Sequence, residues 1–72
     1  MKKINKIKIK LNGKGKLVDN NTKIQKLIND LKIPIKNVAI ELNREILDKK
    51  KLNKIKLKKN DKIEIVHFIG GG

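Results

Sequence analysis

Apolar and charged residues alternate strictly in the first part of the chain. The stretch IKIKL at residues 7–11 places Ile7, Ile9 and Leu11 on one side of an extended strand and two lysines on the other. The next four residues read NGKG and contain the Asn-Gly pair that favours a tight hairpin turn. The pattern therefore predicts a strand, a turn, and an antiparallel second arm at residues 16–19.

The apolar spacing then changes from two residues to three and four, which is the spacing of one helix face. The residues with this spacing are Ile24, Leu27, Ile28 and Leu31. They predict a helix of about two and a half turns at ~3.6 residues per turn. Thr22 and Gln25 fit a capping box at its start, and we expect Pro34 to end it.

Strand-like alternation returns in the second half. VAIEL at residues 38–42 predicts a strand, and Asn43-Arg44 predicts a short turn into a further strand at residues 45–47. Residues 48–59 are rich in lysine and have irregular apolar spacing. There we expect a loop or one short helical turn that places apolar side chains under the sheet, namely Leu52, Ile55 and Leu57.

A turn at residues 59–61 precedes the last predicted strand, residues 62–68, in which Ile63 and Ile65 are the expected inward positions. The order is therefore strand, strand, helix, strand, strand, loop, strand. This order predicts an α+β fold of the ubiquitin-like β-grasp type, with a small mixed sheet and one main helix. We expect a single domain over residues 1–72, of which residues 69–72 form a flexible tail.

Composition excludes several kinds of chemistry. The 72 residues contain no cysteine, so disulfides, thiolate metal sites and thiol nucleophiles are ruled out. One histidine and seven acids offer no recognisable catalytic or metal-binding spacing. His67 is therefore expected to lie on the surface or on a face of the sheet, and we expect a protein that is not an enzyme, binds no metal and holds no cofactor.

The net charge of +13 raises the question of nucleic-acid binding. Of the 20 basic residues only Arg44 is arginine, Phe68 is the only aromatic residue, and the lysines are spread over every segment. Nucleic-acid recognition favours arginine and stacking aromatics. We therefore expect no nucleic-acid partner, and keep a basic RNA-binding module that uses the lysine-rich residues 49–62 as an alternative.

No apolar run is long enough to span a membrane, and the lysine-rich start lacks the apolar core of a signal peptide. We expect a protein without a membrane partner that is a monomer when free. Its expected compartment is the cytoplasm, or an organelle matrix such as the plastid stroma.

Three stretches together resemble the ThiS family of sulfur carrier proteins of thiamine (thiazole) biosynthesis. They are VAIELNREI at residues 38–46, KKNDKIEIVHF at 58–68, and IGGG at 69–72, and the resemblance covers essentially the whole chain. Two departures are visible, because Arg44 and Asn60 stand where the family more often has a turn glycine. Sulfur carriers of molybdopterin synthesis or tRNA thiolation are the neighbouring alternatives.

The resemblance implies a role for the terminal glycines. The carboxylate of Gly72 is a poor electrophile. An ATP-dependent enzyme would therefore first activate it by adenylation. A persulfide sulfur donor would then provide the sulfur of a thiocarboxylate, which thiazole synthase would use. Gly70 and Gly71 lack side chains, so the backbone there is thin enough to enter a narrow channel of the adenylating enzyme.

The end of the last strand offers a surface for such partners. A regular pleat places Val66 and Phe68 on the face away from the helix, where exposed apolar side chains would form a docking patch. We expect Val66, Phe68 and Ile69 to contact partner enzymes. The alternative is a bulge near the end of the strand that returns Phe68 to the core.

Overall fold

The alternating residues at the start form the predicted hairpin. In the computed structural model, which describes residues 5–68, β1 (Lys6–Leu11) pairs antiparallel with β2 (Lys14–Asp19). The turn between them uses Asn12 and Gly13, whose φ angles of 49° and 82° lie in the left-handed region. Glycine and asparagine adopt that region at the lowest cost, which explains why the chain reverses at this pair.

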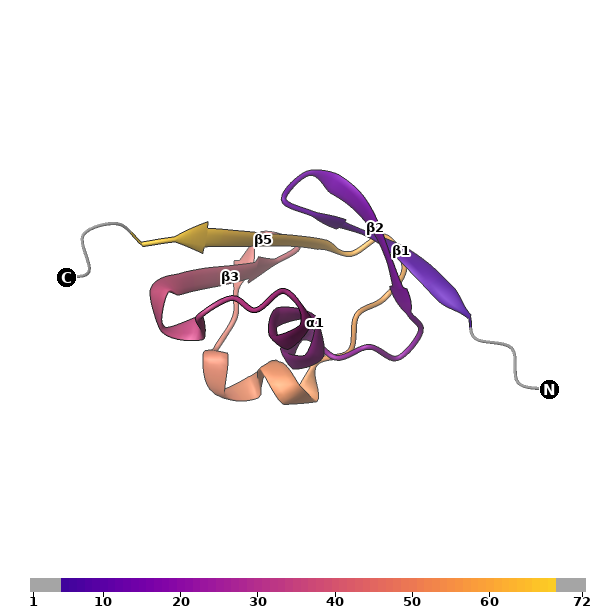
Figure 1. Ribbon diagram of the computed structural model, residues 1–72. Coiled ribbons are helices and arrows are strands. Elements are labelled where there is room, and N and C mark those ends of the chain that lie inside the picture. Colours follow the sequence, from indigo (N-terminus) through magenta and orange to yellow (C-terminus); the bar gives the residue numbers. More distant parts are fainter. Residues whose placement is uncertain (1–4, 69–72) are drawn as a thin grey trace.

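Five strands form one sheet in the order β2-β1-β5-β3-β4. The second hairpin consists of β3 (Val38–Leu42) and β4 (Glu45–Ile46), and the last strand, β5 (Lys62–His67), lies at the centre of the sheet. β5 runs parallel to β1 and antiparallel to β3 (Figure 1). The predicted mixed sheet of the β-grasp type is confirmed.

The predicted helix is present but shorter than expected. α1 (Ile24–Asp30) ends before Pro34, because Lys32 adopts a φ of 57° and reverses the chain. The N–H groups of Lys32 and Ile33 donate to the carbonyls of Asn29 and Ile28, at 3.0 and 3.4 Å. These bonds form a Schellman motif, so the expectation that Pro34 ends the helix is wrong.

The predicted capping box is also wrong. Lys23 is the N-cap and makes no side-chain cap bond, while the Thr22 hydroxyl donates to the carbonyl of Asp19 at 2.6 Å. The free N–H of Ile24 instead donates to the carbonyl of Ile55 at 2.9 Å. A distant backbone segment thus satisfies the helix start, and the capping side chains are not needed.

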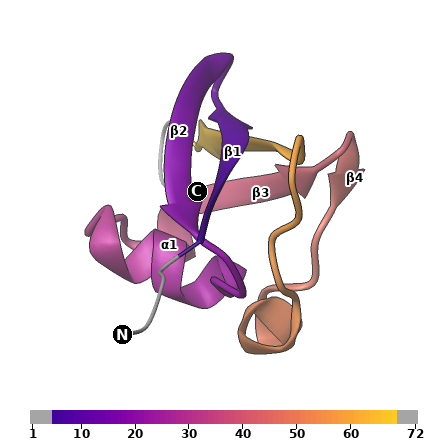
Figure 2. The ribbon, with the colours of Figure 1, turned by 90° about the vertical axis from the view of Figure 1, so that its right-hand side faces the viewer.

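The lysine-rich segment was expected to be a loop or one short helical turn, and the structure shows a short helix there. η1 (Ile35–Asn37) and η2 (Lys49–Lys54) are 3-10 helices, and Asp48 caps the second by accepting from the Lys50 N–H at 2.9 Å. η2 lies on the same side of the sheet as α1 (Figure 2). This arrangement places Leu52 in the core.

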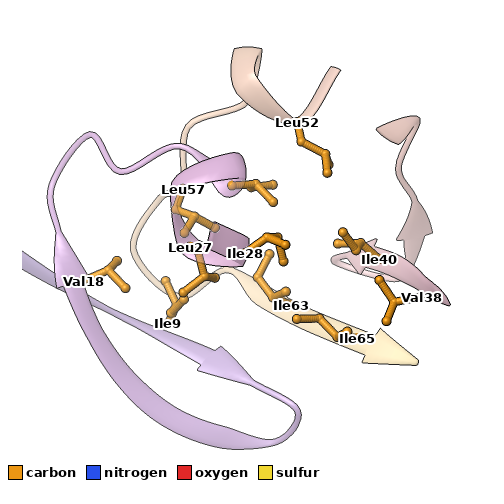
Figure 3. Packing of buried hydrophobic residues seen from close by; sticks show 11 residues of the cluster. Ile9, Val18, Leu27, Ile28, Val38, Ile40, Leu52, Leu57, Ile63 and Ile65 are labelled. Carbon is orange, nitrogen blue, oxygen red and sulfur yellow. The ribbon is translucent and has the colours of Figure 1, made fainter. Parts of the chain in front are cut away.

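The core lies between the sheet and the helical elements. Side chains from β1, β3, β5, α1 and the segment around η2 meet there, as Figure 3 shows for Ile9, Leu27, Ile40, Leu52 and Ile63. The inward positions predicted for β5, Ile63 and Ile65, are buried. Leu42 and Ile55 pack against this cluster as partly buried residues. The alternating pattern therefore predicted the buried side of β1, β3 and β5 correctly.

Candidate docking face and carrier terminus

The central position of β5 determines which of its side chains remain accessible. Its register against β3 pairs Ile65 with Ile40 and Val66 with Ala39. Directly paired residues point to the same side of a sheet, so Val66 shares the outer face, away from α1, with Ala39. Val66 is 50% exposed whereas Ile65 is buried. The pleat is therefore regular up to this point.

Phe68 continues that alternation beyond the last residue of β5. Its N–H donates to the carbonyl of Asn37 at 2.8 Å, so the backbone at Phe68 remains hydrogen-bonded to the segment that precedes β3. The side chain is 57% exposed, and the alternative of a bulge that buries Phe68 is wrong. We call Val66 and Phe68 the docking patch. Exposed apolar residues grouped in this way are a common feature of protein interaction sites.

A lysine from another element adjoins the docking patch. The Nζ atom of Lys49, at the start of η2, lies 5.5 Å from the centroid of the Phe68 ring. This is the distance range of a cation–π contact. The irregular apolar spacing of residues 48–59 does not indicate where Lys49 lies, so this contact cannot be predicted from the sequence.

Two carboxylates and a further apolar side chain occupy the middle of the outer face. Glu41 of β3 pairs with Glu64 of β5 on one side and with Ile46 of β4 on the other. Ile46 is 74% exposed. The outer face thus changes along β5 from acidic side chains in its middle to apolar side chains at its end.

His67 pairs with Val38 and is exposed. Among residues 5–68, no group of three or more histidine, cysteine, aspartate or glutamate residues is arranged to hold a metal ion. No helix in this part of the chain is long and apolar enough to cross a membrane.

Gly70, Gly71 and Gly72, together with Ile69, lie outside the described residues. The structure therefore places two of the predicted docking residues, Val66 and Phe68, and it brings them together on one face. After Phe68, which is the first residue beyond the central strand, the sequence continues as IGGG.

Comparisons with known proteins agree with this architecture. The model of the ThiS family matches residues 3–72. The sulfur carrier protein ThiS of Bacillus subtilis (strain 168) is 40% identical over 65 residues, which cover 89% of this chain and 98% of that protein. A thiazole synthase of Magnetococcus marinus is 35% identical over 66 residues, which cover 92% of this chain and 20% of that protein.

The crystal structure of the thiamine biosynthesis protein ThiS of Geobacter metallireducens superimposes with a TM-score of 0.80. Its sequence is 30% identical, and the match covers 92% of this chain and all of that one. One helix on a mixed five-stranded sheet whose last strand is central defines a ubiquitin-like β-grasp protein. Within this class the chain belongs to the ThiS family and is a sulfur carrier protein of thiamine biosynthesis.

Proposed function

We propose that the carboxylate of Gly72 is the group that carries sulfur. One of its oxygens attacks the α-phosphorus of ATP in an adenylating enzyme, which forms an acyl adenylate and releases pyrophosphate. Sulfide, or the terminal sulfur of a persulfide, then attacks the acyl carbon and expels AMP. With a persulfide the product is an acyl disulfide, and a thiol reduces it to release the thiocarboxylate.

The observation that carries this proposal is the position of the glycines in the chain. Two residues separate them from the end of the central strand of the sheet, and the match to the ThiS family extends through them to residue 72. Gly70 and Gly71 have no side chains, so the backbone at these residues would fit a channel too narrow for other residues. The folded part then provides the surface that other enzymes bind. The chain is a substrate of these enzymes and not itself an enzyme.

The docking patch gives the partner enzymes a surface that precedes the terminal glycines in the sequence. Val66 and Phe68 leave apolar area exposed, and Ile69 continues the same segment in the sequence. Burial of such area stabilises a complex by roughly 25 cal/mol per Å² before the costs of association. We propose that the adenylating enzyme and thiazole synthase bind here in turn.

Thiazole synthase is the partner with the most direct support. One relative that bears this name contains a segment similar to the present chain within a protein about five times longer. A single chain that holds both parts keeps carrier and synthase together at high effective concentration. We further propose that ATP is bound by the adenylating enzyme, and that the carrier works in the cytoplasm or in an organelle matrix such as the plastid stroma.

The first test is the intact mass of the purified protein after incubation with ATP, sulfide and the adenylating enzyme of the same organism. A mass gain equal to the exchange of one oxygen for sulfur is expected. A chain that lacks Gly72 is the control, and it should stay unmodified. If the truncated chain gains the same mass, Gly72 is not the carrier group. If neither chain reacts with an adenylating enzyme of demonstrated activity, the carrier mechanism is wrong.

A further inference from the structure

The outer face contains a pocket of about 250 Å³ at the start of β5, at the opposite end of this strand from the docking patch. Its lining residues are Lys10, Gly13, Arg44, Lys62, Ile63 and Glu64. Lys10 and Lys62 are register partners on the parallel strands β1 and β5, so their side chains point to the same side. We call Lys10, Arg44 and Lys62 the cationic pocket.

A neighbouring hollow of about 360 Å³ extends this positive surface. It shares Lys10 and Lys62 with the cationic pocket and adds Lys8. Four cations therefore lie around two adjoining hollows, and Glu64 is the only acid that lines either of them. The two ion pairs formed within residues 5–68 involve Lys6 and Lys26, so the cations of the pocket have no ion-pair partner in this part of the chain.

Arg44 is at an unusual backbone position. Its φ is 73°, in the left-handed region where residues with a side chain are disfavoured and glycine is preferred. It is also the only arginine in a chain with 19 lysines. A guanidinium differs from an ammonium in that its planar fork binds a carboxylate through two hydrogen bonds. The turn thus keeps the guanidinium at the pocket although glycine would suit the backbone better.

We infer that the cationic pocket binds carboxylate side chains on an acidic surface segment of thiazole synthase. The inference rests on the proposed function, because it adds a second contact to the same docking face. Residues 62 and 68 are about 20 Å apart along an extended strand at ~3.3 Å per residue, which is a distance within one ordinary protein interface. An apolar contact at the end of β5 and an ionic contact at its start would together fix the orientation in which thiazole synthase binds.

An acidic protein surface fits the pocket better than a nucleic acid. Bases are held by stacking on aromatic side chains, and the single aromatic residue of the chain, Phe68, lies at the opposite end of β5. The pocket offers charge and a guanidinium fork alone. Carboxylates satisfy both and need no stacking platform, and contact with them makes association dependent on ionic strength.

The test measures the affinity of the full chain for purified thiazole synthase of the same organism at low and at physiological ionic strength. Arg44→Gly removes the guanidinium and supplies the residue that the turn prefers, so its unfolding midpoint should not fall. We expect about tenfold weaker binding at low ionic strength and a weaker dependence on salt. Arg44→Lys should lose less, because it keeps the charge. Lys26→Gln, on the exposed side of α1, is the matched control and should bind as the wild type does.

Wild-type affinity in Arg44→Gly overturns the inference, and so does a loss of affinity equal to that in Lys26→Gln. The same variants are measured against a labelled single-stranded RNA. Weaker RNA binding with unchanged affinity for thiazole synthase would identify a nucleic-acid site and would also overturn the inference. Failure of the proposed function is seen separately, as a missing mass gain in the wild-type chain.

Discussion

Neighbouring residues at the end of the last strand have opposite roles. Ile65 packs into the core, whereas Phe68, three residues later, keeps more than half of its surface in water. Burial of Ile65 stabilises the folded state, whereas the apolar surface of Phe68 can still be buried by a binding partner. The sequence predicted this division, because strict alternation along a strand assigns every residue to a face.

Substitutions at a buried and an exposed position should therefore differ sharply. Ile40→Ala removes a fully buried side chain from β3 and is expected to lower the free energy of unfolding by about 2–5 kcal/mol. Phe68→Asp should change it by at most about 1 kcal/mol, because the ring is exposed. Urea denaturation of both variants measures the difference. A loss in Phe68→Asp as large as that in Ile40→Ala would mean that the ring supports the core.

Element boundaries show where local sequence stops being sufficient. The sequence predicted that a capping box satisfies the start of the helix. The N–H of Ile24 instead donates to the carbonyl of Ile55, which lies 31 residues further along the chain. The side-chain pattern contains no information on that distant backbone. The cationic pocket was missed for a related reason: Lys10 and Lys62 meet only through the parallel pairing of β1 and β5.

The end of α1 offers a second test at the scale of an element. Lys32 holds the left-handed position of the Schellman motif, where glycine is favoured. Lys32→Gly is therefore expected to raise the free energy of unfolding by about 1 kcal/mol. Lys32→Gln removes the same charge but keeps a side chain, so it should give no comparable gain. Thermal unfolding distinguishes them, and equal gains in both would assign the effect to charge alone.

The whole molecule carries far more positive than negative charge. Its net charge is +13, and residues 5–68 contain two ion pairs, both exposed. Repulsion among the lysines therefore opposes the compact state with little local compensation. The charge places no limit on the fold, which the apolar pattern determines, but it makes stability sensitive to the solvent.

Added salt should stabilise the protein. Raising the ionic strength from about 10 mM to about 150 mM shortens the screening length from ~30 Å to ~8 Å, which weakens repulsion across the molecule. We expect the unfolding midpoint to rise by about 4–8 °C, the shift that about 1 kcal/mol produces in a domain of this size. Sodium chloride and potassium acetate should act equally at the same ionic strength. A midpoint that does not move would show that the lysines are too far apart to repel one another.

The central position of β5 also has a mechanical consequence. A partner that grips the chain beyond Phe68 pulls along a strand that has neighbours on both sides, β1 and β3. The load then acts in shear on the ladders to both neighbours, whereas an edge strand under the same load would share it with a single neighbour. We therefore expect the folded part to withstand a pull on the end of the chain better than a fold whose last strand lies at the edge of the sheet.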